Sequence, residues 1–350
     1  MAKILVTGGG GYIGTHTLVD LVEHGFEVVS ADNFIRTDAR MLAGVERILG
    51  KAVVNYDIDL TDAAATRRIF TENPDIAGVI HFAAVKSVEE SVKEPLLYYR
   101  NNLNILTNVL ECVAEFGVGS FIFSSSCAVY GNVAHLPVTE ATPMQEAESP
   151  YAHTKQIGEG MIRHFAKVHP KTRCILLRYF NPAGAHESAH IGEMPMGVVT
   201  YLVPIVMEVA TGKRAQLTIY GNDYDTRDGT CIRDFIHVSD LANAHTKALE
   251  YLQAGKNETN CEVFNLGIGQ GVTVLEAIEA FERVAKQPLN YQLGERRAGD
   301  VVAIYANYTR AAERLAWQPT RTIDDIMRTA WAWENNRQVA IATYPLPAVR

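Results

Sequence analysis

The chain has 350 residues, of which 47% are hydrophobic, and its formal net charge is −8. This length allows two domains or one large α/β unit, and the acidic balance without a Lys/Arg cluster argues against nucleic-acid binding. No apolar run is long enough for a membrane span, and the N-terminus MAKILVTGG enters a strand-like run directly, so we expect a cytosolic protein.

Short β-branched runs alternate with helical patterns through the first half of the chain. The strand-like runs are 3–7, 26–31, 52–56, 78–83, 120–124 and 174–179. Segments with helical periodicity lie between them, and several end near glycine, as a helix C-cap does. This alternation predicts a Rossmann-type fold, an α/β unit with a doubly wound parallel sheet, over residues 1–181.

The pattern changes after Asn181-Pro182 to loops rich in Gly, Pro and Met. Helices are expected near 198–211, 273–286 and 322–336. We interpret 182–338 as a smaller α/β substrate-binding domain, of which some segments can pack back on the first, and 339–350 as a loose tail. The five cysteines are scattered without a C-x-x-C pair, so neither a disulfide framework nor a metal site is expected.

A glycine-rich turn, TGGGGYIG, follows the first strand and opens a helix. Gly8, Gly11 and Gly14 let the backbone turn tightly and approach a pyrophosphate at the helix N-terminus, where Tyr12 and Ile13 form the first turn. A purely structural glycine turn is the alternative.

An aspartate, Asp32, follows the second strand, beside Asn33, where a carboxylate accepts the adenosine ribose hydroxyls. It favours NAD over NADP, because a 2′-phosphate would place like charges in contact, although Arg36 nearby leaves NADP open. Asp57, after the third strand and next to Ile58, is either an adenine contact or an ordinary solvated aspartate.

The stretch SPYAHTK places Tyr151 and Lys155 on one face of a helix. Tyrosine has a pKa of about 10, which must fall by about 3 before the phenol serves as a base near neutrality, and a neighbouring ammonium and a positive nicotinamide ring lower it. Such a pair also arises by chance. Its conjunction with FSSSCAVYG, whose serines follow the fifth strand at the ligand-binding edge of the sheet, makes it informative.

Together these motifs resemble the extended short-chain dehydrogenase/reductases, and the fuller set resembles the family of UDP-glucose 4-epimerases. The set is TGGGGYIG, HFAAVKSVEESV, PLLYYRNN, FIFSSSCAVYG, SPYAHTK, LLRYFNPAGAH, GNDYDTRDGTCIRDFIHVSDLA and RRAGD, in family order over almost the whole chain.

The resemblance implies an isomerase that interconverts UDP-glucose and UDP-galactose with bound NAD. Sugar C4 is oxidised, the 4-keto sugar turns over, and reduction on the opposite face inverts C4. Tyr151 is then the base, Ser126 hydrogen-bonds the sugar O4, and Lys155 holds the nicotinamide ribose and lowers the pKa of the tyrosine.

Further residues are assigned to the cofactor by the same resemblance. In addition to the glycine turn, Asp32, Tyr151 and Lys155, they are Tyr12, Ile13, Asn33, Asp57, Ile58, Phe82, Ala83, Lys86, Asn101, Ser124 and Tyr179. Asn101 is alternatively a helix cap or break, Lys86 a solvated loop residue, Ser124 a strand-end hydroxyl and Tyr179 a core residue.

The substrate-binding residues implied are Lys86, Ser126, Tyr151, Asn181, Arg233, Arg297 and Asp300. Arginine suits two phosphates because its planar fork donates to each in pairs. The alternatives are surface ion pairs for the arginines, with Asp234 and Glu295, a solvated turn for Asp300, and an Asn-Pro turn for Asn181.

Two positions depart from the family pattern. Tyr201 stands where the family usually has an asparagine before Leu-x-Pro, and Ile304 where a large tyrosine or a small residue excludes or admits N-acetyl sugars. Dehydratases and decarboxylases with this fold carry acids after the catalytic hydroxyl, where this chain has Cys127 and Ala128. A 4-epimerase of another UDP-sugar (N-acetylhexosamine, pentose or uronic acid) and a non-catalytic NAD-binding sensor remain open. The family also implies a homodimer through helices at 95–116 and 151–168.

Overall fold

The computed structural model describes residues 1–297 and 300–344. A seven-stranded sheet lies at its centre, with parallel neighbours throughout, in the order β11-β6-β5-β4-β1-β2-β3. Its strands are β1 (Lys3–Thr7), β2 (Glu27–Ala31), β3 (Val54–Tyr56), β4 (Ile76–His81), β5 (Ser120–Ser126), β6 (Arg173–Tyr179) and β11 (Cys261–Leu266). The predicted doubly wound parallel sheet is confirmed, and β11 is a strand that the sequence did not reveal.

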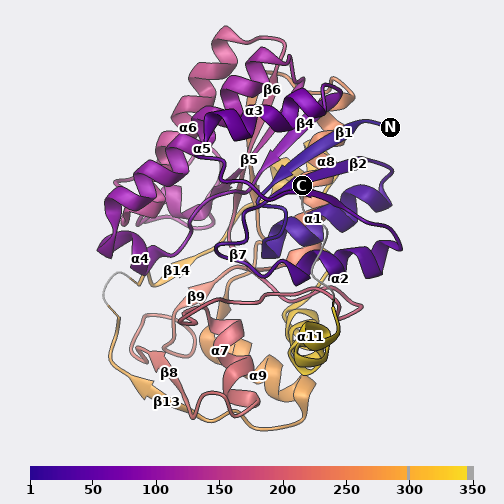
Figure 1. Ribbon diagram of the computed structural model, residues 1–350. Coiled ribbons are helices and arrows are strands. Elements are labelled where there is room, and N and C mark those ends of the chain that lie inside the picture. Colours follow the sequence, from indigo (N-terminus) through magenta and orange to yellow (C-terminus); the bar gives the residue numbers. More distant parts are fainter. Residues whose placement is uncertain (298–299, 345–350) are drawn as a thin grey trace.

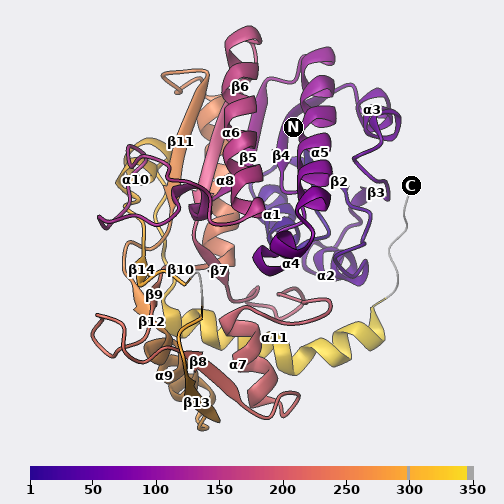
Figure 2. The ribbon, with the colours of Figure 1, turned by 90° about the vertical axis from the view of Figure 1, so that its left-hand side faces the viewer.

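Alternating side chains of the sheet build a separate core on each face. Ile4 of β1 packs with helices α1 (Tyr12–Glu23), α2 (Arg40–Leu49) and α8 (Val238–Gln253), whereas Leu5 packs on the opposite side. That side is covered by α3 (Ala63–Glu72), α5 (Pro95–Glu115) and α6 (Pro150–Val168), and α5 and α6 stand side by side (Figure 2). A parallel sheet covered on both faces explains the nearly continuous apolar runs of its strands.

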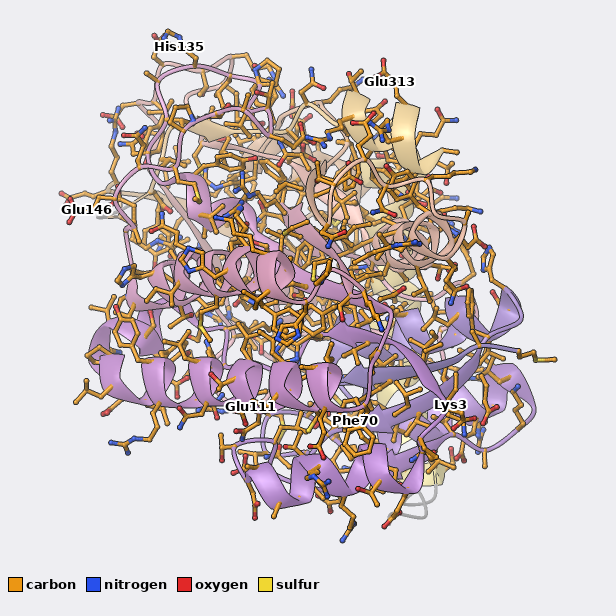
Figure 3. The ribbon with its side chains drawn as sticks, turned by 90° about the horizontal axis from the view of Figure 1, so that it is seen from above. Lys3, Phe70, Glu111, His135, Glu146 and Glu313 are labelled. Atoms are coloured by element: carbon orange, nitrogen blue, oxygen red, sulfur yellow. The ribbon has the colours of Figure 1, made fainter. Side chains whose placement is uncertain are left out.

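The layer over the second face is visible from above in Figure 3. Phe70 of α3 lies there between its own helix and α5, which carries Glu111, and its ring is 5.7 Å from that of Phe116. The segment between β5 and α6, with His135 and Glu146, lies at the far edge of the same view.

The order in which successive strands are added reverses at β1, which has β2 on one side and β4 on the other. Successive connections leave this point in opposite directions and open a crevice at the carboxyl ends of the strands, where ligands bind in such sheets. The loops after β1, β4 and β5 therefore meet at one edge.

The second part of the chain lies below this edge in Figure 1 and has its own apolar core. Its helices are α7 (Leu202–Ala210), α9 (Val274–Ala285) and α11 (Ile323–Thr343). Its short strands are β7 (Asn181–Ala183), β8 (Leu217–Tyr220), β9 (Ile232–Arg233), β10 (Phe235–His237), β12 (Val272–Thr273), β13 (Tyr291–Gly294) and β14 (Ala303–Ile304). Three further short elements are α4 (Val88–Lys93), α10 (Thr309–Leu315) and the 3₁₀ turn η1 (Cys127–Tyr130).

Two segments after residue 181 pack against the first part of the chain, so the chain does not divide simply at that residue. Residues 238–266 return to the first part, where α8 packs on α1 and β11 extends the sheet beside β6. In addition, α11 continues to Thr343 and runs toward α2 (Figure 2), where Arg40 Nη1 donates to the Ile341 carbonyl at 3.1 Å. Residues 339–343 are thus helical rather than part of a loose tail, and 345–350 lie outside the described residues. Within the described ranges, no helix combines the length and apolarity that a membrane span requires.

Candidate active site

The glycine-rich turn between β1 and α1 packs too closely to accept side chains. A Cβ built on Gly14 would collide with the carbonyl oxygen of Gly8, and one on Gly8, whose φ is +71°, would lie 2.8 Å from the Ala83 nitrogen. Gly11 is the N-cap of α1 and offers no capping side chain. The turn therefore presents bare backbone at a helix N-terminus, which is a cradle for a phosphate group.

Two side chains of the first helical turn point away from this cradle. The Tyr12 hydroxyl donates to the carbonyl of Gly184 at 2.6 Å, which links α1 to the residue after β7. Ile13 packs against the core beside the sheet. These contacts hold the start of α1 in place and leave the backbone to meet a ligand.

The carboxylate of Asp32, directly after β2, is buried at the edge of the cradle. Its oxygens accept hydrogen bonds from the backbone nitrogens of Gly10, at 3.1 Å, and Phe34, at 2.9 Å. Burial raises the pKa of Asp32. Arg36, the residue that left NADP open, pairs with Glu90 at 2.8 Å instead.

Several predicted cofactor residues lie at the margins of this crevice. Asp57 is exposed and adds its charge to the field at Asp32, and Asn33 accepts from the backbone of Ile35 at 3.3 Å. Ile58 and Phe82 are half-buried and pack on the two cores of the sheet. The contacts that these four residues make within the chain do not by themselves indicate a ligand.

Ser126, Tyr151 and Lys155 converge at the carboxyl edge of β5. Ser126 ends that strand, and Ser149 caps α6 through a 3.2 Å bond from the Ala152 nitrogen, which places Tyr151 in the first turn of the helix. Lys155 follows one turn later. Its Nζ donates to the Ser124 carbonyl at 2.6 Å and lies 5.9 Å from the centroid of the Tyr151 ring.

The two titratable groups of this trio are shifted by burial in opposite directions. Burial raises the pKa of Tyr151 well above its usual value, and a hydrogen bond with Ser126 only partly opposes this. Burial lowers the pKa of Lys155 to about 8, against the attraction of Glu159. The spacing of Tyr151 and Lys155 predicts a lowered pKa for the phenol. In the protein alone desolvation dominates, and the pKa of Tyr151 is raised instead.

Loops on either side fix this trio. Ser124 and Tyr179 share a buried hydrogen bond at the ends of β5 and β6. Asn101 donates at 3.1 Å to Asn102, which binds Val85 in the loop after β4 and Thr154 in α6. Asn102, the neighbour of the predicted residue, is thus the link between the loop and the helix.

The arginines predicted to meet a diphosphate share one carboxylate. Arg297 donates to Asp300 at 2.9 and 3.1 Å, and Arg233 lies 3.4 Å from the same group while it also donates to the Val301 carbonyl at 2.8 Å. Neither suggested surface pair forms. Asp234 instead accepts three backbone N–H groups, among them that of Ile268 at 2.8 Å.

Asn181 lies at the start of β7, and its side-chain oxygen is buried. Its backbone nitrogen donates to the Asp234 carbonyl at 3.0 Å, whereas its side-chain Oδ1 is buried without a hydrogen bond among the described residues. Buried acceptors are nearly always paired in proteins, so this one fits a ligand donor. Ile304, the departure from the family pattern, is buried among Val129, Phe180 and their neighbours.

The chain that carries this cradle, trio and pair of arginines is similar to known proteins. A model of the NAD dependent epimerase/dehydratase family matches residues 4–267. The chain belongs to this family.

Members of this epimerase/dehydratase family resemble the chain over nearly its whole length. The UDP-glucose 4-epimerase of Schizosaccharomyces pombe is 44% identical over 335 residues, which is 95% of this chain and 93% of the relative. The structure of UDP-glucose 4-epimerase from Bifidobacterium longum in complex with NAD+ and UDP superposes with a TM-score of 0.91 at 42% identity and covers 97% of this chain and 99% of that one. The Stenotrophomonas maltophila enzyme, with bound NAD and formylated UDP-arabinopyranose, gives a TM-score of 0.93 at 38% identity, with coverages of 97% and 100%.

This family member also has a buried cluster of charged side chains around Glu159 that the sequence motifs did not indicate. Glu159, one turn after Lys155, accepts from Arg178 at 2.6 Å, Arg163 at 2.8 Å and Ser125 at 2.6 Å. The spacing from Lys155 to Glu159 was the available signal, since residues four apart share a helix face. The cluster locks α6 to β5 and β6, and so fixes the distance between the trio's elements.

Proposed function

We propose that this member of the NAD dependent epimerase/dehydratase family is an isomerase that interconverts UDP-glucose and UDP-galactose with bound NAD. The observation that carries this proposal is the meeting of Ser126, Tyr151 and Lys155 beside the glycine cradle, in a chain that matches UDP-glucose 4-epimerases over 95% of its length.

The residues of the chain fit the cofactor. The backbone around Gly8, Gly11 and Gly14 would hold the pyrophosphate, Asp32 the adenosine ribose, and Lys155 the nicotinamide ribose. When bound there, NAD supplies a hydride acceptor and donor next to the substrate. The buried negative charge of Asp32, with Asp57 nearby, supports NAD rather than NADP, because a 2′-phosphate would meet like charge.

The chain's own part in the chemistry is the movement of one proton at the sugar O4. Tyr151 takes this proton during oxidation at C4 and returns it during reduction, while the Ser126 hydroxyl hydrogen-bonds the same oxygen. The raised pKa of Tyr151 opposes its ionisation in the protein alone. The Lys155 ammonium, together with the positive charge of the oxidised ring, is therefore needed to bring the phenol into range.

The two positions that carry acids in dehydratases and decarboxylases with this fold hold no acid in this chain. The residues after Ser126 are Cys127 and Ala128, and burial raises the pKa of the Cys127 thiol to about 12. A thiol with that pKa stays neutral near pH 7 and does not serve as a general base. This supports an epimerase over a dehydratase.

The nucleotide-sugar would bind between the trio and the second part of the chain. Arg233 and Arg297 would meet the diphosphate, Asp300 the uridine ribose, and Asn181 the sugar or phosphate through its unpaired buried oxygen. Lys86 would contact the ligand at the end of the loop after β4.

We also propose a cytosolic homodimer that acts in galactose metabolism and binds neither nucleic acid nor membranes. The start of α5, a helix that packs beside α6, would contribute to the dimer interface, because Leu96 and Leu97 are adjacent exposed apolar residues there. All five cysteines are free, as is usual in a reducing compartment.

The proposal is tested by incubating the purified protein with UDP-galactose, UDP-N-acetylgalactosamine, UDP-xylose and UDP-glucuronate and separating the products by chromatography. UDP-glucose is expected from UDP-galactose, and acid precipitation is expected to release NAD. Preferential turnover of another sugar would replace the substrate, and no conversion of any of the four would favour a non-catalytic NAD-binding protein.

A further inference from the structure

We propose that Phe123 is a positioning residue, whose ring holds the Lys155 ammonium in place and keeps it charged beside the Tyr151 phenol. Phe123 lies in β5, three residues before Ser126, and its side chain is buried. The inference rests on the proposed function, because it concerns the cation that brings the phenol into range.

The ammonium of Lys155 is withdrawn from water. Lys155 is 5% exposed, and the cavity that adjoins it, lined also by Asn102, Thr154 and Phe123, has a volume of about 10 Å³, which is room for one water molecule at most. A buried ammonium that loses its hydration gives up its proton more readily. Groups of the protein must therefore stabilise the charge in place of water.

Two consecutive residues of β5 contact this ammonium. Lys155 Nζ donates to the Ser124 carbonyl at 2.6 Å and lies 4.8 Å from the centroid of the Phe123 ring. The second distance is that of a cation–π contact, in which the negative face of the ring attracts the charge. Because the carbonyl takes only one of the three N–H groups, donors remain for the nicotinamide ribose.

The Phe123 ring is held between a strand and a helix. It stacks on the His81 ring of β4, with centroids 6.0 Å apart and planes inclined by 14°. Toward α6 it meets Gly158, where an added Cβ would lie 2.9 Å from Phe123 Cζ. A glycine inside a helix lowers stability relative to alanine, and this one leaves the space that the ring occupies. Gly158 and Lys155 are three residues apart and share a helix face, so the ring lies under the lysine.

Glu159 also attracts the ammonium, from one helical turn away. Its carboxylate is shared with two other cations, Arg178 at 2.6 Å and Arg163 at 2.8 Å, whose charges offset it. Burial still lowers the pKa of Lys155 to about 8. The carboxylate thus compensates only part of the lost hydration.

The remaining side chains around the ammonium carry no charge near neutral pH. Burial lowers the pKa of His81 in β4 to about 3, raises that of Tyr179 in β6 to about 12 and raises that of Tyr151 in α6 as well. Two residues of α5, Asn102 and Leu106, line the adjoining cavity without a charge. The ring of Phe123 therefore supplies much of what keeps the proton on the lysine.

Loss of the ring should change the pH range in which the site works. Without it the pKa of Lys155 should fall by about one pH unit, which corresponds to one desolvated cation–π contact. A lysine that loses its proton earlier stops assisting the phenol earlier, so the alkaline limb of the pH profile should move toward neutral pH.

A fluorinated ring tests this inference with little change in shape. Phe123 would be replaced by a phenylalanine fluorinated at both meta positions, which weakens the negative face of the ring, and separately by Phe123→Leu. We would measure kcat for UDP-galactose from about pH 6 to about pH 10. The alkaline limb should move by about half a pH unit in the fluorinated enzyme and by about one unit in Phe123→Leu.

Phe121 provides the matched control. It lies two residues earlier on the same face of β5, is buried, and stacks on His81 with the same centroid distance of 6.0 Å. The same fluorinated residue at this position, and Phe121→Leu, should leave the alkaline limb where it is in the wild type. Equal shifts for the two phenylalanines, or no shift for fluorinated Phe123, would overturn the inference.

A direct titration of Lys155 keeps this test separate from that of the proposed function. The protein with bound NAD would be labelled with isotopes at the lysine ε carbons, and the Lys155 resonance assigned by its loss in Lys155→Met. The pKa of Lys155 should be lower in Phe123→Leu by about one unit. If it is lower but UDP-galactose is not converted, the proposed function fails and this inference stands. If it is the same in all Phe123 variants, the inference fails even in an active enzyme.

Discussion

The pair of Tyr151 and Lys155 shows what a motif does and does not provide at the scale of single residues. The spacing brings an ammonium near the phenol, yet burial raises the pKa of Tyr151 and lowers that of Lys155 to about 8. Lys155 is still largely a cation near pH 7, since its pKa lies above that value. Further positive charge in the crevice is thus required before the phenol becomes an effective base.

Asp32 offers the clearest test of cofactor choice at this scale. Asp32→Asn keeps the size of the side chain but removes the charge that would accept the ribose hydroxyls, so we expect NAD affinity to fall about tenfold or more, as for a lost charge-assisted hydrogen bond. Fluorescence titration of the cofactor measures this. Asp59→Asn, at an exposed carboxylate in the loop after β3 that has no assigned role at the cofactor, is the control with a small effect. Equal affinities of wild type and Asp32→Asn for NAD would contradict the assignment.

The residue at a helix N-terminus determines how firmly the start of that helix is held. Ser149 caps α6 with a hydrogen bond from the Ala152 nitrogen and so sets where Tyr151 lies, whereas Tyr201 begins α7 without a cap. A tyrosine there lacks the hydrogen bond that a capping side chain gives, so the start of α7 is less stable than that of α6.

Tyr201→Asn is therefore predicted to stabilise the protein. An asparagine N-cap is worth about 1 kcal/mol, so the free energy of unfolding should rise by that amount in urea titrations. Ser149→Ala, which removes an existing cap, should lower the free energy of unfolding by a similar amount. A Tyr201→Asn variant less stable than the wild type would show that the ring contributes packing that exposure does not reveal.

Elements were predicted well where a local pattern decides their structure. The six early strands and the helix starts at Tyr12 and Pro150 follow from apolar periodicity and capping residues. In contrast, β11 contains the buried polar residues Glu262 and Asn265, which interrupt its apolar pattern, and it joins the sheet through pairing with the distant β6. Long-range pairing of this kind leaves little trace in a single sequence.

The residues of the candidate site also fall into two groups, those that a local motif predicts and those that only the structure reveals. The sequence predicts the glycines, Ser126, Tyr151 and Lys155, because they lie in short motifs. Glu159 and Glu193 instead contact segments that are far away in the chain. Only the folded structure brings such partners together.

Buried neutral histidines give the whole molecule a pH-dependent stability. Burial lowers the pKa of four histidines, to about 3 for His16 and His81 and about 4 for His237 and His245. The unfolded chain binds these protons below about pH 6.5 while the folded chain does not, so stability is present above that pH and is lost as the pH falls toward 3 to 4. Asp234, whose pKa is raised to about 6, offsets a small part.

From pH 7.5 to pH 5.5 the free energy of unfolding should fall by roughly 5 kcal/mol, because each of the four histidines contributes about 1.4 kcal/mol over the pH unit below 6.5 and Asp234 offsets a small part. Urea titrations at the two pH values measure the difference. A stability that stays constant or increases on acidification would contradict the assignment of these histidines as neutral.

The proposed dimer is also a property of the whole molecule. Leu96→Glu would place a charge on the exposed apolar surface at the start of α5, so the mass in sedimentation equilibrium should fall toward that of a single chain. Val339→Glu, at another exposed apolar residue on α11, is the control and should leave the mass unchanged. A monomeric wild type would remove the proposed interface.

The central claim is that the Tyr151 phenol exchanges a proton with the substrate while NAD stays bound, and Tyr151→Phe tests it most directly. Turnover of UDP-galactose should fall by about 100-fold or more, the range expected for a lost general base, while the NAD content and the melting temperature stay close to those of the wild type. Turnover near the wild-type value, with NAD still bound, would contradict the account.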